Sequence, residues 1–437
     1  MMHIKPVWGV AATAATVAGL LLPMPASVAA APSCAAVNTD PTTSTYSLTG
    51  DCQLTGTWVV DDGWTVDGNN HTITLGAGFS GPAVRSESGP VGGAPAELTV
   101  EHVTIQAAGA SAGILFDGAK GAVHDVVING GAGNDYGVEI ANTNGVVFAT
   151  TLPPDQVKVD KDTTIGGYQK AGIYVHGDIR FSVLRVAISS PLAVSSQGVA
   201  GILATEGAHG SIKESQISLS DAVPATASAF GAGVRIVKDS SSLPRRVEVK
   251  RNVLIGTNAD IGISVENPSQ AAKLTAAVDC NLIRRSDSRT SGDTYGVGVA
   301  AWDGPKTNVV LTNSTFKGNW KHATGDISGT TVTAGPPNDI RTVDSTCPPG
   351  APTHVRAHRG NHKIKVTWHA ASAPSWAPLT EYLVKAKAAG HRAVTKKVGP
   401  KATKAVLKGL KNNRRYVVTV TARSNGGQAS GTDRVRL

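Results

Sequence analysis

The 437-residue sequence contains few aromatic residues, few charged residues and only four cysteines. Aromatic residues make up 5% and charged residues 17%, against 41% hydrophobic residues, and this balance excludes an intrinsically disordered chain. A mean hydropathy of −0.04 excludes a polytopic membrane protein. No segment keeps the 3.6-residue period of amphipathic helices, so a helical solenoid is also excluded. The 49 glycines instead favour an all-β chain with many tight turns.

The first 30 residues are predicted to be a signal peptide. Lys5 precedes an apolar stretch from Val7 to Leu22, and small residues offer a cleavage site after Ala29 or Ala30. An uncleaved membrane anchor is the alternative. A lipid anchor is disfavoured, because the sequence before Cys34 lacks the leucine that a lipoprotein signal places before its cysteine. We therefore expect a secreted, extracellular protein that a cell wall could retain.

The four cysteines allow three disulfide pairings in an oxidising compartment. The local choice joins Cys34 to Cys52 and Cys280 to Cys347, which would fasten the two ends of the region between them. A metal site is the alternative, but no two cysteines have the close spacing of a zinc knuckle.

A short glycine-led pattern of alternating apolar residues occurs seven times in the middle of the chain. Its glycines are Gly113, Gly137, Gly172, Gly201, Gly233, Gly262 and Gly296. Such a unit cannot bury its apolar face alone, so a recurring unit predicts a solenoid. A second apolar segment follows each glycine strand, as in 181–188 and 247–253, and two or three short strands per turn describe a parallel β-helix.

The stretch Trp64-Thr-Val-Asp-Gly-Asn-Asn-His-Thr-Ile-Thr-Leu75 resembles the first coil of pectin-lyase-like right-handed β-helices. The resemblance covers about residues 52–330 and implies a right-handed parallel β-helix, which we place at 31–346. That superfamily includes polysaccharide lyases, glycoside hydrolases, epimerases, esterases and non-catalytic adhesins. The resemblance therefore implies a fold without specifying a reaction.

The chain has two parts of opposite charge. Residues 351–437 contain 18 Lys and Arg against Glu381 and Asp433, a net charge of +16, and the remainder carries −7. Prolines at 347–352 predict an extended linker between the parts. Beyond it, alternating segments at 355–357, 363–368, 381–386, 405–407 and 416–422 predict a β-sandwich.

Residues 353–437 resemble a fibronectin type III domain. Trp368 ends the second predicted strand, Tyr382 lies in the third, and Leu410 to Tyr416 have the spacing of that family's tyrosine corner. Asn412 replaces the proline usual in this motif. The chain has no Arg-Gly-Asp sequence, so integrin recognition has no support.

Strand alternation predicts which side chains of the glycine strands face outward. One outward row is Leu115, Glu139, Tyr174, Leu203, Arg235, Ser264 and Gly298, and a second is Asp117, Ala141, His176, Thr205, Val237, Glu266 and Ala300. The densest reactive group is Glu139, Tyr174, His176 and Asp178. We predict these four as catalytic residues, with Arg235, Asp117 and Glu266 as substrate-binding residues.

A loop at 151–168 is expected to overhang this group as the wall of a groove. Asp160 and Asp162 on it could hold a calcium ion through carboxylate oxygens, although no cofactor is required.

Two reactions would suit the group. Glycoside hydrolysis needs two carboxylates, here Glu139 and Asp178. A lyase acting on uronic acids needs a base and an acid, here His176 and Tyr174, with a cation for the uronate carboxylate. The alternative is that outward polar residues only keep a β-helix soluble.

Motifs resembling those of polygalacturonases occur at 38–40, 61–62, 208–210 and 235–238, but they are too far apart for one site. No central coil shows the arginine and aspartate cluster of calcium-dependent pectate lyases.

The sequence thus predicts a secreted, monomeric polysaccharide-directed protein, either a glycosidase or polysaccharide lyase or a non-catalytic adhesion or cell-wall-binding protein. The basic domain would retain an anionic extracellular polysaccharide. A nucleic acid is a less favoured partner than the polysaccharide, because no base-stacking aromatic pattern accompanies the positive charge.

Overall fold

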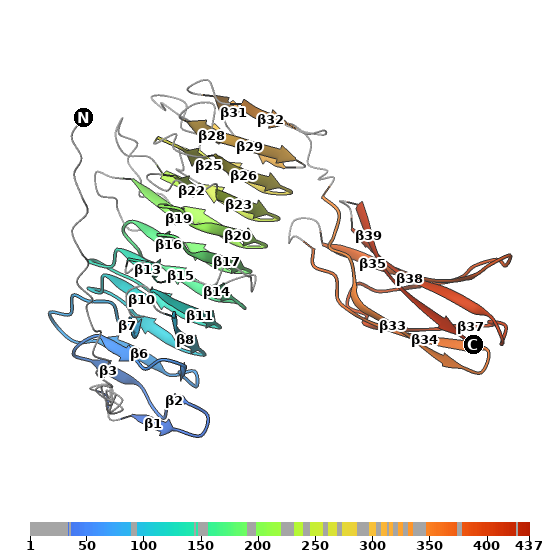
Figure 1. The fold of residues 1–437 in the computed structure, drawn as a ribbon, viewed down its shortest axis with the longest axis horizontal. Coiled ribbons are helices and arrows are strands. Elements are labelled where there is room, and N and C mark those ends of the chain that lie inside the picture. The colour runs from blue at the N-terminus through green and yellow to red at the C-terminus, as the bar shows by residue number, and fades with distance from the viewer. Residues whose placement is uncertain are drawn as a thin grey trace, which may run out of the picture.

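The computed structural model contains two β-domains, a long solenoid and a C-terminal sandwich (Figure 1). It describes residues 34, 36–88, 94–143, 146, 156–189, 198–219, 231–238, 245–256, 261–268, 273–285, 297–302, 307–312, 314–317, 322–326, 331–334, 347–373, 378–424 and 427–437. The predicted signal peptide and Pro153 to Asp155 lie outside the described residues. The described residues contain no helix, and hence none long and apolar enough to span a membrane.

Three sheets form the solenoid. Sheet A comprises β1 (Val37–Asp40), β2 (Thr45–Leu48), β5 (Trp64–Asp67), β8 (Ala96–Glu101), β11 (Ala119–His124), β14 (Val157–Asp160), β17 (Arg180–Leu184), β20 (His209–Lys213), β23 (Arg245–Lys250), β26 (Leu274–Asp279), β29 (Thr307–Thr312) and β32 (Thr331–Ala334). Sheet B comprises β3 (Cys52–Leu54), β6 (Thr72–Leu75), β9 (Thr104–Gln106), β12 (Val127–Asn129), β15 (Thr164–Gly166), β18 (Ala187–Ser189), β21 (Gln216–Leu219), β24 (Val253–Gly256), β27 (Leu282–Arg285) and β30 (Thr315–Lys317). Sheet C comprises β4 (Trp58–Val60), β7 (Val84–Ser86), β10 (Ala112–Asp117), β13 (Tyr136–Ala141), β16 (Ala171–His176), β19 (Val199–Ala204), β22 (Gly231–Val237), β25 (Ile261–Glu266), β28 (Val297–Trp302) and β31 (His322–Asp326).

Successive strands within each sheet pair in parallel, one coil apart, which is the arrangement of a parallel β-helix. The exception is β1, which pairs antiparallel with β2 at the N-terminal end of sheet A. The solenoid begins one coil earlier than the resemblance implied. β2, β3 and β4 precede Trp64 and pair with β5, β6 and β7.

The recurring glycines from Gly113 to Gly262 form a column in sheet C that leaves no room for a side chain. A Cβ on Gly137 would lie 2.7 Å from the carbonyl oxygen of Gly172, and one on Gly172 would lie 2.8 Å from that of Gly201. Isoleucines of sheet B close the same space from inside, with Ile188 Cγ2 at 2.5 Å from the Gly172 position. The glycine repeat is thus a packing requirement of stacked coils.

At six of the corners between sheets A and B, a single residue lies in the left-handed region, where residues other than glycine are uncommon. It has φ between 50 and 58° at His102, Asp125, Arg185, Glu214, Arg251 and Cys280. The next residue points inward. Buried Asn252 accepts the Ser215 amide at 2.9 Å and donates to the Ile212 carbonyl oxygen at 2.9 Å, so these backbone groups stay paired inside the core.

The sandwich has a three-stranded sheet of β33 (Thr353–Gly360), β34 (Lys363–His369) and β37 (Lys404–Lys408). The four-stranded sheet contains β36 (Val394–Val398), β35 (Leu379–Ala388), β38 (Arg415–Ser424) and β39 (Gly427–Arg436). Trp368 and Tyr382 are buried between the sheets. The Tyr416 hydroxyl accepts from the Lys411 amide at 2.9 Å, which is the predicted tyrosine corner. β36 and β39 were not predicted.

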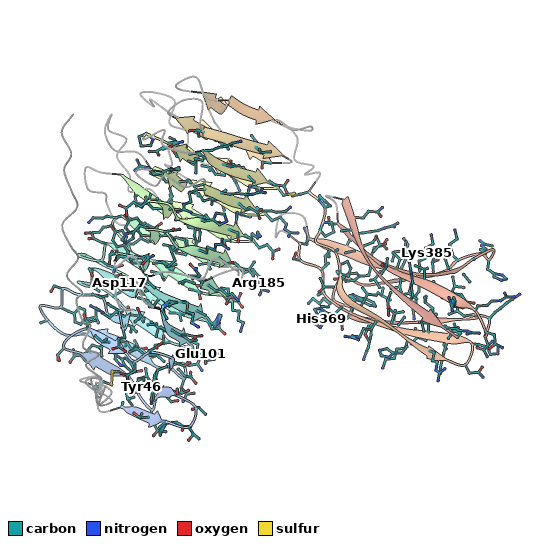
Figure 2. All side chains as sticks on the ribbon, viewed as in Figure 1. Tyr46, Glu101, Asp117, Arg185, His369 and Lys385 are labelled. Carbon is teal, nitrogen blue, oxygen red and sulfur yellow. A yellow bond between two sulfur atoms is a disulfide. The ribbon has the colours of Figure 1, made fainter. Side chains whose placement is uncertain are left out.

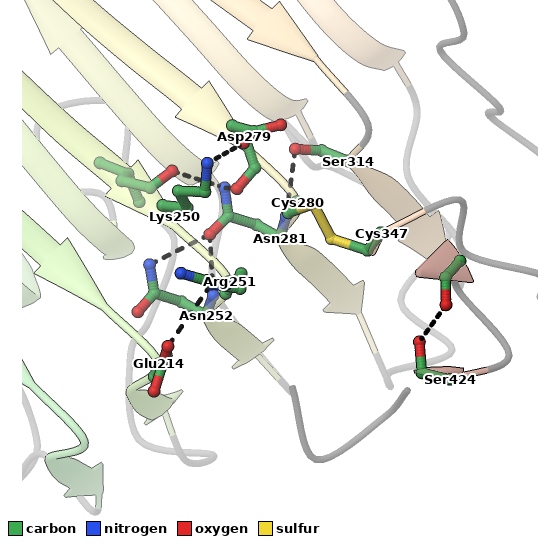
Figure 3. Close-up of a disulfide and its surroundings, with 12 residues drawn as sticks. Glu214, Lys250, Arg251, Asn252, Asp279, Cys280, Asn281, Ser314, Cys347 and Ser424 are labelled. Atoms are coloured by element: carbon green, nitrogen blue, oxygen red, sulfur yellow. Dashed lines mark hydrogen bonds and ion pairs between the residues drawn. A yellow bond between two sulfur atoms is a disulfide. The ribbon is translucent and has the colours of Figure 1, made fainter. Parts of the chain in front are cut away.

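The two disulfides of the local pairing are present, Cys34–Cys52 and Cys280–Cys347. The second joins the corner between β26 and β27 to the start of the linker (Figure 3). The predicted extended linker is in fact anchored at both ends, because Cys347 is buried and the Gly350 amide donates to the Ser372 carbonyl oxygen in the sandwich at 2.7 Å.

Candidate functional site

The outer face of sheet C presents the first outward row nearly as predicted. Leu115 pairs with Glu139, Glu139 with Tyr174, and so on through Leu203 and Arg235 to Ser264. The last coil differs, because Ser264 pairs with Ala300 and Glu266 with Trp302. The segment Gly296-Val-Gly298-Val offers two glycines, and the register places Gly298 beside Gly262 in the glycine column. Gly298 and Ala300 are therefore not in the rows expected for them.

Three aromatic rings lie in a stack at the centre of this face. Tyr136 stacks on Tyr174 with ring centroids 4.8 Å apart, and Tyr174 stacks on His176 at 4.4 Å. Burial, followed by the nearby Tyr174, Glu139 and Asp135, raises the pKa of Tyr136 well above its usual value. Tyr136 is therefore a neutral phenol at any physiological pH and can donate a hydrogen bond.

His176 lies between two carboxylates. Its Nε2 is 3.0 Å from Glu139 Oε1 and its Nδ1 is 3.9 Å from Glu206 Oε2. The structure thus brings Glu139, Tyr174 and His176 together, as expected for the candidate group. Glu206 was not predicted, since it follows β19 in a turn where the alternation ends.

A cavity of about 210 Å³ lies beside Tyr174. Its lining residues are Tyr136, Lys170, Tyr174, Gly198, Val199, Ala200, Leu203 and Arg235. None of these residues carries a carboxylate, and neither His176 nor Glu139 is among them. Tyr174 therefore belongs both to the cavity lining and to the stack with His176.

Two ion pairs hold the cations that line this cavity. Lys170 Nζ lies 2.8 Å from Asp135 Oδ2, and Arg235 binds both carboxylate oxygens of Glu266 at 2.8 and 2.9 Å. Ser264 donates to Glu266 at 2.7 Å. The two predicted substrate-binding residues Arg235 and Glu266 thus bind one another, and their donors and acceptors are fixed in place at the rim. Tyr136 and Lys170 were missed, although both lie just before the glycines of their strands.

Asp178 belongs to a different cluster. Its carboxylate lies 2.9 Å from Arg245 in sheet A, so Asp178 and Glu139 have separate partners. His209 lies in the same cluster. Burial, and then the positive charges of Arg180, Arg245 and Arg246, lower the pKa of His209, against the opposing effect of Asp178.

Asp117 lies on β10 (Figure 2) and accepts from Thr143 Oγ1 at 2.7 Å. It is not among the residues that line the cavity. The expected loop at 151–168 is wrong from residue 157 onward, because that part forms β14 and β15 of an ordinary coil. Asp160 accordingly ends a strand, where its carboxylate binds His124, and Asp162 lies at a corner with φ 63°. Calcium binding by these two residues stays a prediction.

One further group could hold a metal ion among the described residues. The ligand atoms of Asp67, Glu101 and His102 all lie within 4.8 Å of one another. Asp67 already binds His102 Nδ1 at 3.2 Å and the Asn69 amide at 2.9 Å, so local contacts account for the grouping.

The charges of the sandwich are mostly unpaired. All 18 Lys and Arg of 351–437 are described, yet only Lys397 and Arg423 make ion pairs, both with Glu381. The other acidic residue, Asp433, accepts the Ala357 amide at 2.7 Å. His369 and Lys385 mark the two sheets, and basic residues project from both (Figure 2).

Comparison with known proteins gives information on the C-terminal part. No curated protein matches the chain, and no pectin lyase family is identified for the solenoid. Solved structures with similarity include the FN1–FN3 domains of chicken CNTN1 (24% identity, 21% of this chain, TM-score 0.18) and an FN3 domain of human collagen XX (24% identity, 20% of this chain and 91% of that chain, TM-score 0.17). The chain spans 33% of the length of the chicken CNTN1 structure.

The family model of the fibronectin type III domain matches residues 350–435. This range contains the seven strands, the buried Trp368 and the tyrosine corner described above. A domain of this type, together with two disulfides, is typical of extracellular proteins. Residues 350–435 therefore form a fibronectin type III domain, attached to a parallel β-helix.

Proposed function

We propose that the protein is a secreted polysaccharide-binding protein, in which the sheet C cavity holds a sugar unit and the basic domain contacts anionic groups of the same polymer. The observation that carries the proposal is the cavity between Tyr136, Tyr174 and Arg235. Aromatic side chains with a few fixed polar groups are typical of small-ligand sites.

The charge arrangement favours an uncharged, hydroxyl-rich unit in the cavity itself. Lys170 and Arg235 are each matched by a carboxylate, so the rim offers donors and acceptors without a surplus cation. Sugar hydroxyls both donate and accept and would complete this set. Among the residues that line the cavity, a uronate carboxylate would find no unmatched positive charge, whereas the fibronectin domain has many.

The test is binding of the purified protein to a panel of neutral and acidic polysaccharides. Tyr136→Ala and Tyr174→Ala should each weaken binding about tenfold, because each removes part of the ring stack that bounds the cavity. Leu115→Ala is the matched control, since Leu115 lies on the same outward row but does not line the cavity. Unchanged binding in both tyrosine variants would exclude this cavity as the sugar site.

A second candidate, polysaccharide lyase activity, is favoured by the hydrogen bond between Glu139 and His176. A carboxylate that orients a histidine is the usual arrangement of a general base. Release of unsaturated uronates, followed by ultraviolet absorbance, tests it, and His176→Ala or Glu139→Gln should abolish the product. The glycosidase alternative predicts new reducing ends that disappear in the Glu139→Gln, Asp178→Asn double variant. Absence of product from any polysaccharide, with binding retained, leaves a non-catalytic binding protein, which we expect to be monomeric.

A further inference from the structure

A second cavity lies on the four-stranded sheet of the fibronectin domain, across β38 and β39. It has a volume of about 280 Å³ and is lined by Arg415, Tyr416, Val417, Arg434, Val435 and Arg436. It shares no residue with the sheet C cavity. The three arginines that line this small cavity indicate an anion-binding site.

The register of the sheet places like charges next to one another. Arg415 lies directly opposite Arg436, and Val417 lies between Arg434 on one side and Lys387 on the other. Like charges directly opposite one another destabilise a sheet. The described residues supply none of these four cations with an ion pair. The arrangement therefore does not serve the stability of the domain.

The floor of the cavity is apolar. Val417 lines the cavity and is 44% exposed. Tyr416 is buried and its hydroxyl is bonded to the backbone of Lys411, so it offers no exposed ring. The site thus combines a small apolar surface with a ring of guanidinium groups and lacks an aromatic platform for stacking bases.

We propose that this cavity binds uronate carboxylates of an acidic polysaccharide. The planar guanidinium fork matches a carboxylate with two parallel hydrogen bonds, which a lysine cannot form. The C–H face of the sugar ring would lie on Val417. Nucleic acid is disfavoured because unstacked bases need exposed aromatic rings. The arginine cavity would be a second binding site beside the sheet C cavity. Only the class of polymer that it binds rests on the proposed function.

The opposite sheet of the same domain provides a matched control. Lys363, Lys365 and Lys408 lie on the outer face of the three-stranded sheet, where Lys363 is directly opposite Lys408. These three residues are also exposed and make no ion pair with the described residues, but they are lysines and are not among the residues that line the arginine cavity. Removing three positive charges from either sheet changes the net charge equally.

The experiment compares two triple variants of the full-length protein, Arg415→Gln, Arg434→Gln, Arg436→Gln and Lys363→Gln, Lys365→Gln, Lys408→Gln. Binding to immobilised polygalacturonate is measured at fixed ionic strength. The arginine variant should lose at least about tenfold in affinity, corresponding to one charged hydrogen-bonded contact or more, and the lysine variant less than about threefold. Equal losses would show that only net charge matters and would overturn the proposal.

Two further measurements separate the remaining explanations. Replacing the three arginines by lysines keeps the charge and should still lose most of the affinity, and retained affinity would contradict recognition by guanidinium groups. Tighter binding of single-stranded DNA than of polygalacturonate to this site would show that the proposed class of polymer is wrong. Binding of a neutral polysaccharide, which has no carboxylate for the arginine site, should be weakened by Tyr174→Ala, so failure of the sheet C proposal can be recognised independently.

Discussion

The solenoid and the fibronectin domain differ in how many of their charged side chains form ion pairs. In the solenoid, cations are matched across neighbouring coils, as in Lys120 with Glu97, Lys250 with Asp279 and Arg235 with Glu266. In the fibronectin domain, 18 cations share two acidic residues, and only two cations are paired. Folding pairs many of the cations in the first region and leaves most of those in the second to solvent or a partner. A surplus of this kind is informative about binding and not about fold.

The largest expected effect comes from removing the disulfide that fastens the last coils of the solenoid to the start of the linker. The double variant Cys280→Ser, Cys347→Ser opens a 67-residue connection and should cost about 4 kcal/mol of unfolding free energy. The loss should be concentrated in the coils between the two cysteines. Hydrogen exchange should therefore speed up in β28 and β29 and stay slow in β37 and β38. Equal acceleration in both domains would show that the disulfide stabilises more than the last coils.

A substitution in the glycine column comes next. Gly172→Val should destabilise the solenoid by about 3 kcal/mol, because its side chain would meet the Gly201 carbonyl oxygen and Ile188. Chemical denaturation provides the measurement. Gly56→Ala is the control, since Gly56 has open space around its Cβ position and no positive φ, and it should be near neutral. A tolerated Gly172→Val would contradict the idea that the repeat reflects close stacking.

Charge removal distinguishes the two regions directly. Lys250→Gln breaks a solenoid ion pair of 2.7 Å and should cost about 0.5 kcal/mol. Lys363→Gln relieves repulsion from Lys408 directly opposite and should stabilise the fibronectin domain by about 0.3 kcal/mol. Thermal unfolding at low ionic strength would show both shifts, and high salt should reduce them. If both substitutions changed the melting temperature in the same direction, the proposed difference in charge pairing between the two domains would be wrong.

The smallest effect concerns pH. Because the pKa of His209 is lowered on folding, the folded state binds a proton less readily than the unfolded state. The stability contributed by neutral His209 is present above the unfolded value near 6.5 and is lost as the pH falls through the folded pKa. His209→Gln should flatten this part of the pH profile of the solenoid melting temperature. An unchanged profile would assign the acid sensitivity to other groups.

Much of the solenoid could be predicted from sequence, because glycine and alternation report on neighbours one coil away. Glu139, Tyr174 and His176 were brought together on this basis. The single-residue corners were not recognisable, since His102, Arg185 and Cys280 share a backbone conformation but no chemistry. β39 was missed because its Gly, Gln, Ser and Thr residues lack an apolar alternation.

The candidate site was predictable only in part, because side chains choose partners across sheets. Asp178, which follows the sheet C strand β16, binds Arg245 of sheet A, a contact that no period in the sequence reports. The cavity also depends on Tyr136 and Lys170, which stand before their glycines and outside the alternating rows.

The anchoring of Cys347 has a consequence for avidity. With Cys347 covalently held at a solenoid corner and Gly350 bonded to Ser372, few freely rotating residues separate the two domains. A polymer segment captured by one domain would therefore meet the other at an effective concentration set by fixed geometry, without the dilution that a long flexible tether imposes.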